Sequence, residues 1–187
     1  MQVSRTELGG VWIVEPRVFS DARGFFFETY QEARFAELGI SSRFVQDNHS
    51  RSTKGSLRGL HYQLRHPQAK LCRVVIGEVV DVVADIRLGS PTFGNWISVI
   101  LSAENKREIF VPRGFAHGFA VLSDSAEFLY KCDDLYHPDD EYGVVWNDPD
   151  LKIDWTLEAP VLSSKDRSLP RLSQIDRAKL PVYRDSD

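Results

Sequence analysis

The most regular pattern in the sequence is Val80-Asp81-Val82-Val83-Ala84-Asp85-Ile86. Every second residue from Val80 to Ile86 is apolar, and the positions between them include two aspartates. A period of two places alternate side chains on opposite faces of an extended chain, which is the pattern of a β-strand. The stretch therefore predicts a strand with one continuous apolar face.

Similar short patterns continue on both sides of this stretch. We expect strands at residues 11–14, 25–30, 43–50, 57–63, 71–76, 80–86, 95–102, 108–111, 115–122 and 127–132. Turn-forming residues separate several of them, including Gly77, Gly89-Ser90-Pro91 and Pro112-Arg113-Gly114. Because helical patterns are missing between these strands, an antiparallel sandwich or barrel is favoured over a parallel α/β sheet.

Helical patterns are few. Residues 31–38 have an apolar side and are followed by Gly39, a natural stop, so they predict one short helix. Residues 173–179 predict a second short helix near the C-terminus. Between them, Trp146 and Trp155 lie in segments rich in Asp and Pro, which we interpret as ordered loops pinned by large aromatic side chains.

Composition excludes several classes of protein. The 187 residues carry a formal net charge of -4, so there is no general basic surface for nucleic acid. Apolar runs are all shorter than the roughly 18–20 residues that cross a bilayer, and residues 1–10 lack a secretory apolar segment. Cys72 and Cys132 lie far apart and do not form a CxxC pair. We therefore expect free buried thiols, a cytoplasmic location and no membrane partner.

One strand-like stretch is unusually polar. It reads Leu57-Arg58-Gly59-Leu60-His61-Tyr62-Gln63 and combines a cation, an imidazole, a phenol and an amide. One interpretation is a strand whose polar face lines a pocket, and the other is an edge strand with solvated polar residues.

Metal binding is the first question that the histidines raise. Of five histidines, His61 and His117 stand in polar strand-turn contexts, whereas His66 beside Pro67 is interpreted as solvated. The segment Pro112-x-Gly114-x-x-His117 is similar to half of a cupin metal motif. The other half is incomplete, because Gln63 stands where a second imidazole would strengthen the case. We therefore expect no metal.

Acid–base chemistry is the alternative use of these groups. His61 could serve as a general base, since imidazole titrates near neutral pH, and Asp81, Asp85 and Asp166 are all candidates to orient it. Tyr130 could be a core residue or a general acid.

Other side chains are suited to an anionic ligand. Lys70 could extend to solvent or stabilise an oxyanion. Arg23 and Arg58 stand beside glycines where a phosphate could approach, and Tyr136 could stack on a nucleobase.

Taken together, these segments resemble the dTDP-4-dehydrorhamnose 3,5-epimerase family over nearly the whole chain. The matching motifs are Asp21-x-Arg23-Gly24-x-Phe26-x-Glu28, Gln46-Asp47-Asn48, Leu57 to Gln63, Asp85-Ile86-Arg87, Ser90-Pro91-Thr92-Phe93-Gly94, Pro112-x-Gly114-Phe115-Ala116-His117-Gly118-Phe119, Tyr130 to Tyr136, Trp146-Asn147-Asp148-Pro149 and Leu162-Ser163-Ser164-Lys165-Asp166. One such motif would be weak, but this many in order are specific.

The resemblance implies a cupin-like antiparallel β jelly roll with a few short helices. It implies a single domain over residues 1–187, with a jelly-roll core at about 43–133 and C-terminal loops and a short helix after it. It also implies a homodimer, no metal and no cofactor.

The resemblance implies roles for individual residues as well. The substrate would be dTDP-4-dehydro-6-deoxy-D-glucose, inverted at C3 and C5 to give dTDP-4-dehydro-L-rhamnose. His61 would be the base, oriented by Asp166, and Tyr130 the acid, with Lys70 and His117 supporting the sugar and the enolate oxygen. The other substrate-binding residues would be Arg23, Phe26, Glu28, Gln46, Asn48, Arg58, Tyr136, Glu141 and Lys165.

Three alternatives stay open. The protein could be a related epimerase that inverts only C3 or only C5. It could instead be a metal-dependent cupin oxygenase, or a jelly-roll module that binds sugar without catalysis. The direction of Arg58 is also open, because in a regular strand Arg58 and His61 face opposite ways. A bulge at Gly59, a ligand spanning two regions, or contacts from a partner subunit could each explain it.

Overall fold

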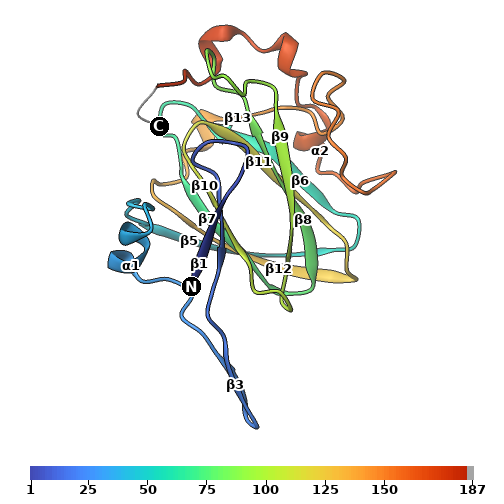
Figure 1. Ribbon diagram of the computed structural model, residues 1–187. Helices are drawn as coiled ribbons and strands as arrows, with labels where there is room; N and C mark the ends of the chain where they lie inside the picture. The colour runs from blue at the N-terminus through green and yellow to red at the C-terminus, as the bar shows by residue number, and fades with distance from the viewer. Residues whose placement is uncertain (185–187) are drawn as a thin grey trace.

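The computed structural model describes residues 1–184, and two antiparallel sheets facing each other form its body (Figure 1). The six-stranded sheet has the order β1 (Gln2–Arg5), β2 (Trp12–Glu15), β10 (Glu108–Val111), β7 (Lys70–Ile76), β12 (Ser125–Cys132), β5 (Gln46–Thr53). The five-stranded sheet has the order β13 (Glu141–Gly143), β6 (Leu57–Gln63), β11 (Phe115–Val121), β8 (Glu78–Asp85), β9 (Trp96–Ser102). This architecture confirms the all-β prediction of a cupin-like jelly roll.

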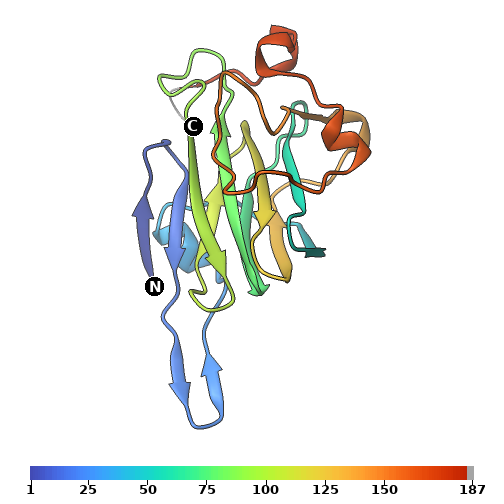
Figure 2. The same cartoon turned by 90° about the vertical axis from the view of Figure 1, so that its right-hand side faces the viewer.

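The remaining elements are short. A separate two-stranded hairpin, β3 (Phe19–Asp21) with β4 (Gly24–Phe26), projects well away from the sheets in Figure 2. The helical segments are α1 (Glu32–Glu37), α2 (Ser164–Arg167) and the single turns η1 (Pro138–Asp140), η2 (Leu172–Gln174) and η3 (Arg177–Lys179). In the part of the chain that the structure describes, no helix is long and apolar enough to span a membrane.

Strand β8, which contains the alternating stretch, is buried on both faces. Its inner face contributes Val79 and Val83 to the core between the sheets. Its outer face contributes Val80 and Val82 to a second core, which is closed by Trp155 and other residues of the C-terminal tail. The prediction of a strand is confirmed, but both of its faces are covered, because the tail shields the side that an ordinary sandwich would expose.

The C-terminal tail is held by tryptophans of its own and of β9. The indole of Trp155 donates to the carbonyl oxygen of Trp146 at 2.8 Å, and the indole of Trp96 donates to the carbonyl oxygen of Leu151 at 2.8 Å. Trp155 is almost fully buried against the five-stranded sheet. The predicted ordered loops are therefore confirmed, and they place α2 beside β6.

The first predicted helix is confirmed and the second is wrong. Helix α1 begins after Gln31, whose side chain accepts from the amide of Arg34, and ends before Gly39, whose φ is +94°. Residues 173–179 do not form one helix but fall into the separate turns η2 and η3. The break has a local cause, since the side chain of Asp176 caps η3 by accepting from the amide of Ala178 at 3.0 Å.

Two strand predictions at the N-terminus need correction. The strand predicted at residues 11–14 is β2, and an unpredicted strand, β1, precedes it and pairs with it. The strand predicted at residues 25–30 ends at Phe26. Beyond it the chain turns toward α1, where Glu28 pairs with Arg34 at 2.8 Å and the ring of Tyr30 packs on Phe35.

Candidate functional site

Strand β6 contains a bulge that decides the direction of its polar side chains. His61 is opposite His117, and Arg58 is opposite Phe119, so Gly59 and Leu60 together face one residue of β11. The φ of Gly59 is +117°, and a Cβ atom there would lie 2.7 Å from the carbonyl oxygen of His117. Only glycine fits this conformation and this close approach. The bulge puts Arg58 and His61 on the same face of β6.

That face borders a cavity of about 600 Å³ between the two sheets. Of the predicted site residues, eleven catalytic or substrate-binding side chains line it together: His61, Tyr130, Asp166, Lys70, Gln46, Asn48, Arg58, His117, Tyr136, Glu141 and Lys165. The interpretation of residues 57–63 as a pocket-lining strand is therefore confirmed over the edge-strand alternative.

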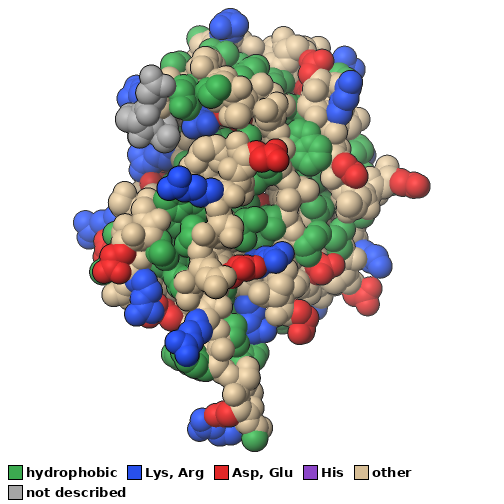
Figure 3. Space-filling model, in the orientation of Figure 1, with side chains coloured by type: hydrophobic (Ala, Val, Ile, Leu, Met, Phe, Trp, Pro, Cys, Tyr) green, Lys and Arg blue, Asp and Glu red, His purple; other side chains and the backbone are tan. Residues whose placement is uncertain are grey.

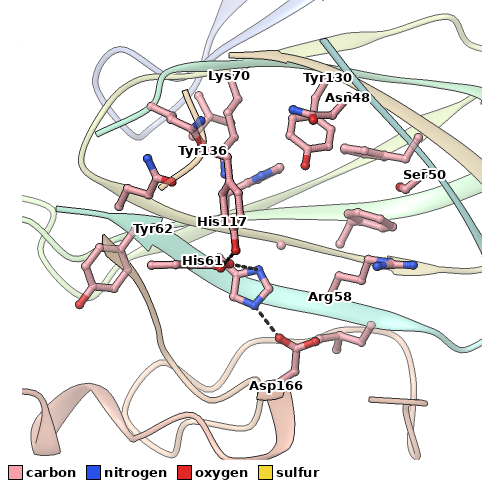
Figure 4. Close-up of a pocket in the computed structure, with 18 of the residues that line it drawn as sticks. Asn48, Ser50, Arg58, His61, Tyr62, Lys70, His117, Tyr130, Tyr136 and Asp166 are labelled. Carbon is pink, nitrogen blue, oxygen red and sulfur yellow. Dashed lines mark hydrogen bonds and ion pairs between the residues drawn. The ribbon is translucent and has the colours of Figure 1, made fainter. Parts of the chain in front are cut away.

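The imidazole of His61 is held by a carboxylate from the C-terminal tail. Its Nε2 atom lies 2.5 Å from Oδ1 of Asp166 (Figure 4). Asp166 is in α2, and its other carboxylate oxygen accepts from the hydroxyl of Ser163 at 2.8 Å. Burial raises the pKa of Asp166, but hydrogen bonds from His61 and Ser163 outweigh it and hold the pKa below its usual value. Asp166 is thus an ionised partner for the ring.

A second carboxylate, Glu141, connects three pocket residues. It pairs with the ammonium group of Lys165 and accepts from the hydroxyl of Tyr136 at 2.5 Å. Its Oε1 atom lies 3.8 Å from Nδ1 of His61. Burial raises the pKa of Glu141, but the hydrogen bonds from Lys165 and Tyr136 lower it by more. The pKa of Glu141 is therefore below its usual value. The same hydrogen bond raises the pKa of Tyr136 to about 12.

His117 has a carboxylate of its own. Its Nε2 atom lies 2.9 Å from both oxygens of Asp81, which is fully buried on β8. Asp81 is therefore not the partner of His61. Neither is Asp85, which instead forms a buried pair with Arg87 at 2.8 Å. Of the three aspartates that the sequence left open, only Asp166 orients His61.

The facing wall comes from the six-stranded sheet. Tyr130 is paired with Asn48 on β5 and with Cys72 on β7, which puts its phenol on the inner face, across the cavity from His61 in Figure 4. Burial raises the pKa of Tyr130 to about 12, so the phenol keeps its proton at neutral pH. The ammonium group of Lys70 lies 6.0 Å from the centre of the Tyr130 ring.

Other polar groups of the cavity are also ordered. The amide of Gln46 donates to the side-chain oxygen of Asn48 at 3.0 Å and accepts from the backbone amide of Tyr136 at 3.0 Å. On the opposite wall, the guanidinium of Arg58 donates to the hydroxyl of Ser52 at 3.0 Å. These contacts fix hydrogen-bond donors along the cavity.

Three predicted substrate-binding residues do not line this cavity. Arg23 and Phe26 lie on the projecting hairpin, where the Arg23 side chain is 91% exposed and Phe26 is 70% exposed. Glu28 lies just beyond the hairpin and pairs with Arg34. The space-filling view shows the hairpin extending from the body with both acidic and basic side chains near its tip (Figure 3).

Sequence reasoning missed two supporting residues. Ser163 caps α2 and holds Asp166, and the pattern Ser163-x-x-Asp166 is a recognisable N-cap signal. Ser52 holds Arg58, and nothing in the sequence pattern pointed to it. Asp81, one of the open candidates to orient His61, contacts His117 instead.

The arrangement is suited to moving protons. One wall carries the imidazole of His61 with an ionised orienting carboxylate, and the other carries a protonated phenol and a cation. A carbon beside a ketone, held between the walls, could lose a proton to one side, and the planar carbanion so formed could gain one from the other.

Comparisons with known proteins agree with this chemistry. The family model described as dTDP-4-dehydrorhamnose 3,5-epimerase matches residues 5–174. The dTDP-4-dehydrorhamnose 3,5-epimerase of Pseudomonas aeruginosa is 59% identical over 169 residues, covering 89% of this chain and 93% of the relative.

Solved structures give the same result. The dTDP-6-deoxy-D-glucose-3,5-epimerase of Legionella pneumophila, in complex with dTDP-4-keto-L-rhamnose, is 54% identical with a TM-score of 0.96 and covers 98% of each chain. ChmJ, a 3′-monoepimerase from Streptomyces bikiniensis in complex with dTDP-quinovose, is 37% identical with a TM-score of 0.90, covering 95% of this chain and 92% of ChmJ. This chain belongs to the dTDP-4-dehydrorhamnose 3,5-epimerase family.

Proposed function

We propose that this protein inverts C3 and C5 of dTDP-4-dehydro-6-deoxy-D-glucose, giving dTDP-4-dehydro-L-rhamnose for the route to L-rhamnose. The whole chain acts as a single cytoplasmic isomerase domain and uses no redox cofactor. The observation that carries the proposal is the position of the His61–Asp166 pair and of Tyr130 on facing walls of one cavity.

His61 is the base for both carbons. Because Asp166 accepts the proton of Nε2, the lone pair of the neutral ring lies on Nδ1. The C4 ketone acidifies the hydrogens on C3 and on C5, so one base can remove each in turn. Positioned acid–base groups each contribute roughly 10²- to 10⁴-fold to such steps.

Tyr130 is the acid that completes each inversion. Its phenol donates a proton to the carbanion from the face opposite His61. Burial raises the pKa of Tyr130, so the phenol is protonated before the reaction. Negative charge develops on the C4 oxygen when the enolate forms. Lys70 stabilises it, and His117, when protonated, donates to it while Asp81 balances the charge.

The nucleotide part of the substrate binds to cavity-lining residues other than the acid–base groups. Arg58 binds phosphate, and Tyr136 stacks on the thymine. Gln46 and Asn48 supply polar contacts along the way, and Glu141 and Lys165 hold the hydroxyl of Tyr136 in place.

The protein works as a homodimer in which the hairpin of one subunit reaches the cavity of the other. Supporting this, Phe19, Phe25 and Phe26 expose more than half of their surface on the hairpin, and such exposed apolar residues mark interaction surfaces. Arg23 and Phe26 would then bind nucleotide in the partner's cavity, with Glu28 beside them.

A C3-only epimerase is the second candidate, since ChmJ has a similar structure and is a 3′-monoepimerase. Incubation with substrate in D₂O, followed by NMR of the product, separates the possibilities. Double inversion puts deuterium at both C3 and C5, and single inversion puts it at one carbon. Nucleotide binding with no deuterium at either carbon would reduce the protein to a sugar-binding module, and oxygen uptake with loss of the ketone would indicate an oxygenase.

A further inference from the structure

Three side chains of types that can bind a metal meet outside the cavity lining. His66 is in the loop between β6 and β7, and Asp134 and His137 are in the loop between β12 and η1. One ligand atom from each lies within 4.8 Å of the others. The two imidazole rings are stacked, with centroids 3.9 Å apart and an interplanar angle of 16°.

The two loops are fixed to each other by backbone contacts. The side-chain amide of Gln63 donates to the carbonyl oxygens of His66 at 2.6 Å and Leu135 at 3.2 Å, and its oxygen accepts from the amide of His137 at 2.8 Å. The buried carboxylate of Asp140 accepts from the backbone amide of His66 at 2.8 Å. The backbones of the two loops are therefore held together before any ligand arrives.

The donor atoms are available. Within residues 1–184, neither imidazole ring makes a hydrogen bond, and the carboxylate of Asp134 accepts only from the amide of its neighbour Leu135. Gln63 holds both loops near this point by donating to His66 in one and Leu135 in the other. A shared cation would give a partner to ring nitrogens that have none among these residues.

The donor set indicates the class of ligand. Two imidazoles and one carboxylate, with a water in the fourth position, suit Zn²⁺ and similar transition metals rather than Ca²⁺ or Mg²⁺. Bonds of about 2.0–2.1 Å bring tetrahedral ligands to about 3.3 Å from one another. The lone pairs of two stacked rings run nearly parallel, so binding one ion requires a ring to turn out of the stack. His66 is exposed and the other two residues are half-buried, so the His66 ring is the one with room to turn.

We propose that His66, Asp134 and His137 bind one divalent transition-metal ion, which fastens the β6–β7 loop to the loop that carries Tyr136. Because His137 follows Tyr136 directly, the ion restrains the aromatic ring at the mouth of the cavity. The site is separate from His61 and His117, whose ring nitrogens already contact carboxylates.

Calorimetric titration of the metal-free full chain, made without a histidine tag, tests the binding. Wild type should take up about one Zn²⁺ per chain, and His66→Asn or His137→Asn should weaken binding by more than roughly tenfold. His49→Asn, which removes an exposed histidine paired with Glu127, and His61→Asn should bind as wild type does. Absence of binding, equal binding in the His66 and His137 variants, or loss in His61→Asn would overturn the site.

Two further measurements use the same variants. Co²⁺ should give the visible absorption of a tetrahedral site in wild type and not in His137→Asn, whose folding is checked by its unfolding curve. Zn²⁺ should slow amide hydrogen exchange in residues 133–140 of wild type and not of His66→Asn. Unchanged exchange in wild type would contradict the fastening of the two loops.

Discussion

Arg58 and His61 point into the same cavity because Gly59 and Leu60 together face Gly118 across the β6–β11 pairing. The extra residue shifts the alternation of side chains by one position. A regular strand would direct either the cation or the imidazole into the opposite core. The bulge therefore lets one strand supply both a base and a phosphate-binding group.

Replacing Gly59 with Ala should destabilise the fold and disturb the site. The new Cβ would lie 2.7 Å from both Gly118 Cα and the carbonyl oxygen of His117, in a backbone with a φ of +117°. We expect a loss of about 2 kcal/mol or more in the free energy of unfolding, measured by urea denaturation. Gly9→Ala is the matched control, because nothing lies within 4 Å of its new Cβ. Equal stability of the two variants would contradict the bulge.

Replacing Asp166 with Asn should lower kcat while leaving nucleotide binding nearly intact. The amide keeps the size of the side chain but loses the charge that orients His61, so we expect a fall of roughly 10²-fold or more. Asp154→Asn makes the same change at an exposed turn, where the carboxylate only caps the amide of Thr156, and should keep full activity. Steady-state kinetics with substrate, together with dTDP titration, separates the two effects.

The supporting hydroxyl of Ser163 should matter less than Asp166 itself. Ser163→Ala removes the cap of α2 and one hydrogen bond to Asp166, at a cost of about 1 kcal/mol in the free energy of unfolding. A kcat reduced as much as in Asp166→Asn would show that the hydroxyl takes part directly.

Glu108 makes stability depend on pH. It is 1% exposed on β10, and its Oε1 atom has no hydrogen-bond partner among the described residues. Burial raises its pKa to about 8, although Arg73 and Lys131 lower it in part. Because the folded pKa is above the unfolded one, the folded state binds the proton more tightly, and stability falls as pH rises from about 4.5 toward about 8.

Glu108→Gln should remove most of this dependence. The neutral amide cannot be forced to ionise, so the variant should be more stable than wild type at pH 8 by at least about 1 kcal/mol. The advantage should shrink toward pH 5. Urea unfolding at several pH values measures it, and Glu127→Gln, a carboxylate paired with exposed His49, is the control. A constant difference between variant and wild type at all pH values would argue against a titrating Glu108.

Mixing two inactive variants tests the shared site. If the hairpin completes the partner's cavity, a heterodimer of His61→Asn and Arg23→Ala contains one site with both defects and one intact site. Random exchange of subunits then restores activity in about a quarter of the sites. Continued inactivity after exchange, with dimers shown by light scattering, would place Arg23 outside the partner's site.

The alternation of apolar and polar residues was enough to predict most strands and the fold class. It did not predict β1, which has only four residues. That strand is recognisable by its pairing with β2 and not by its own sequence pattern. It also failed at residues 173–179, because the helical pattern there is interrupted by the cap at Asp176.

The site was predictable in its residue types and less so in its pairings. His61 and Tyr130 could be selected because polar side chains stand out in apolar strands. The partner of His61 could not be chosen, since Asp166 is 105 positions away in the chain and reaches it through a tail that packs on the five-stranded sheet. The direction of Arg58 depended on a bulge, which a pattern of period two cannot reveal.

The most direct test of a single base is deuterium incorporation by His61→Asn in D₂O, followed at C3 and C5 by NMR. Wild type run in parallel should exchange both positions. The variant should exchange neither carbon while still binding dTDP, because the same imidazole removes both protons. Exchange retained at either carbon would show that another group removes that proton and would contradict the assignment of His61.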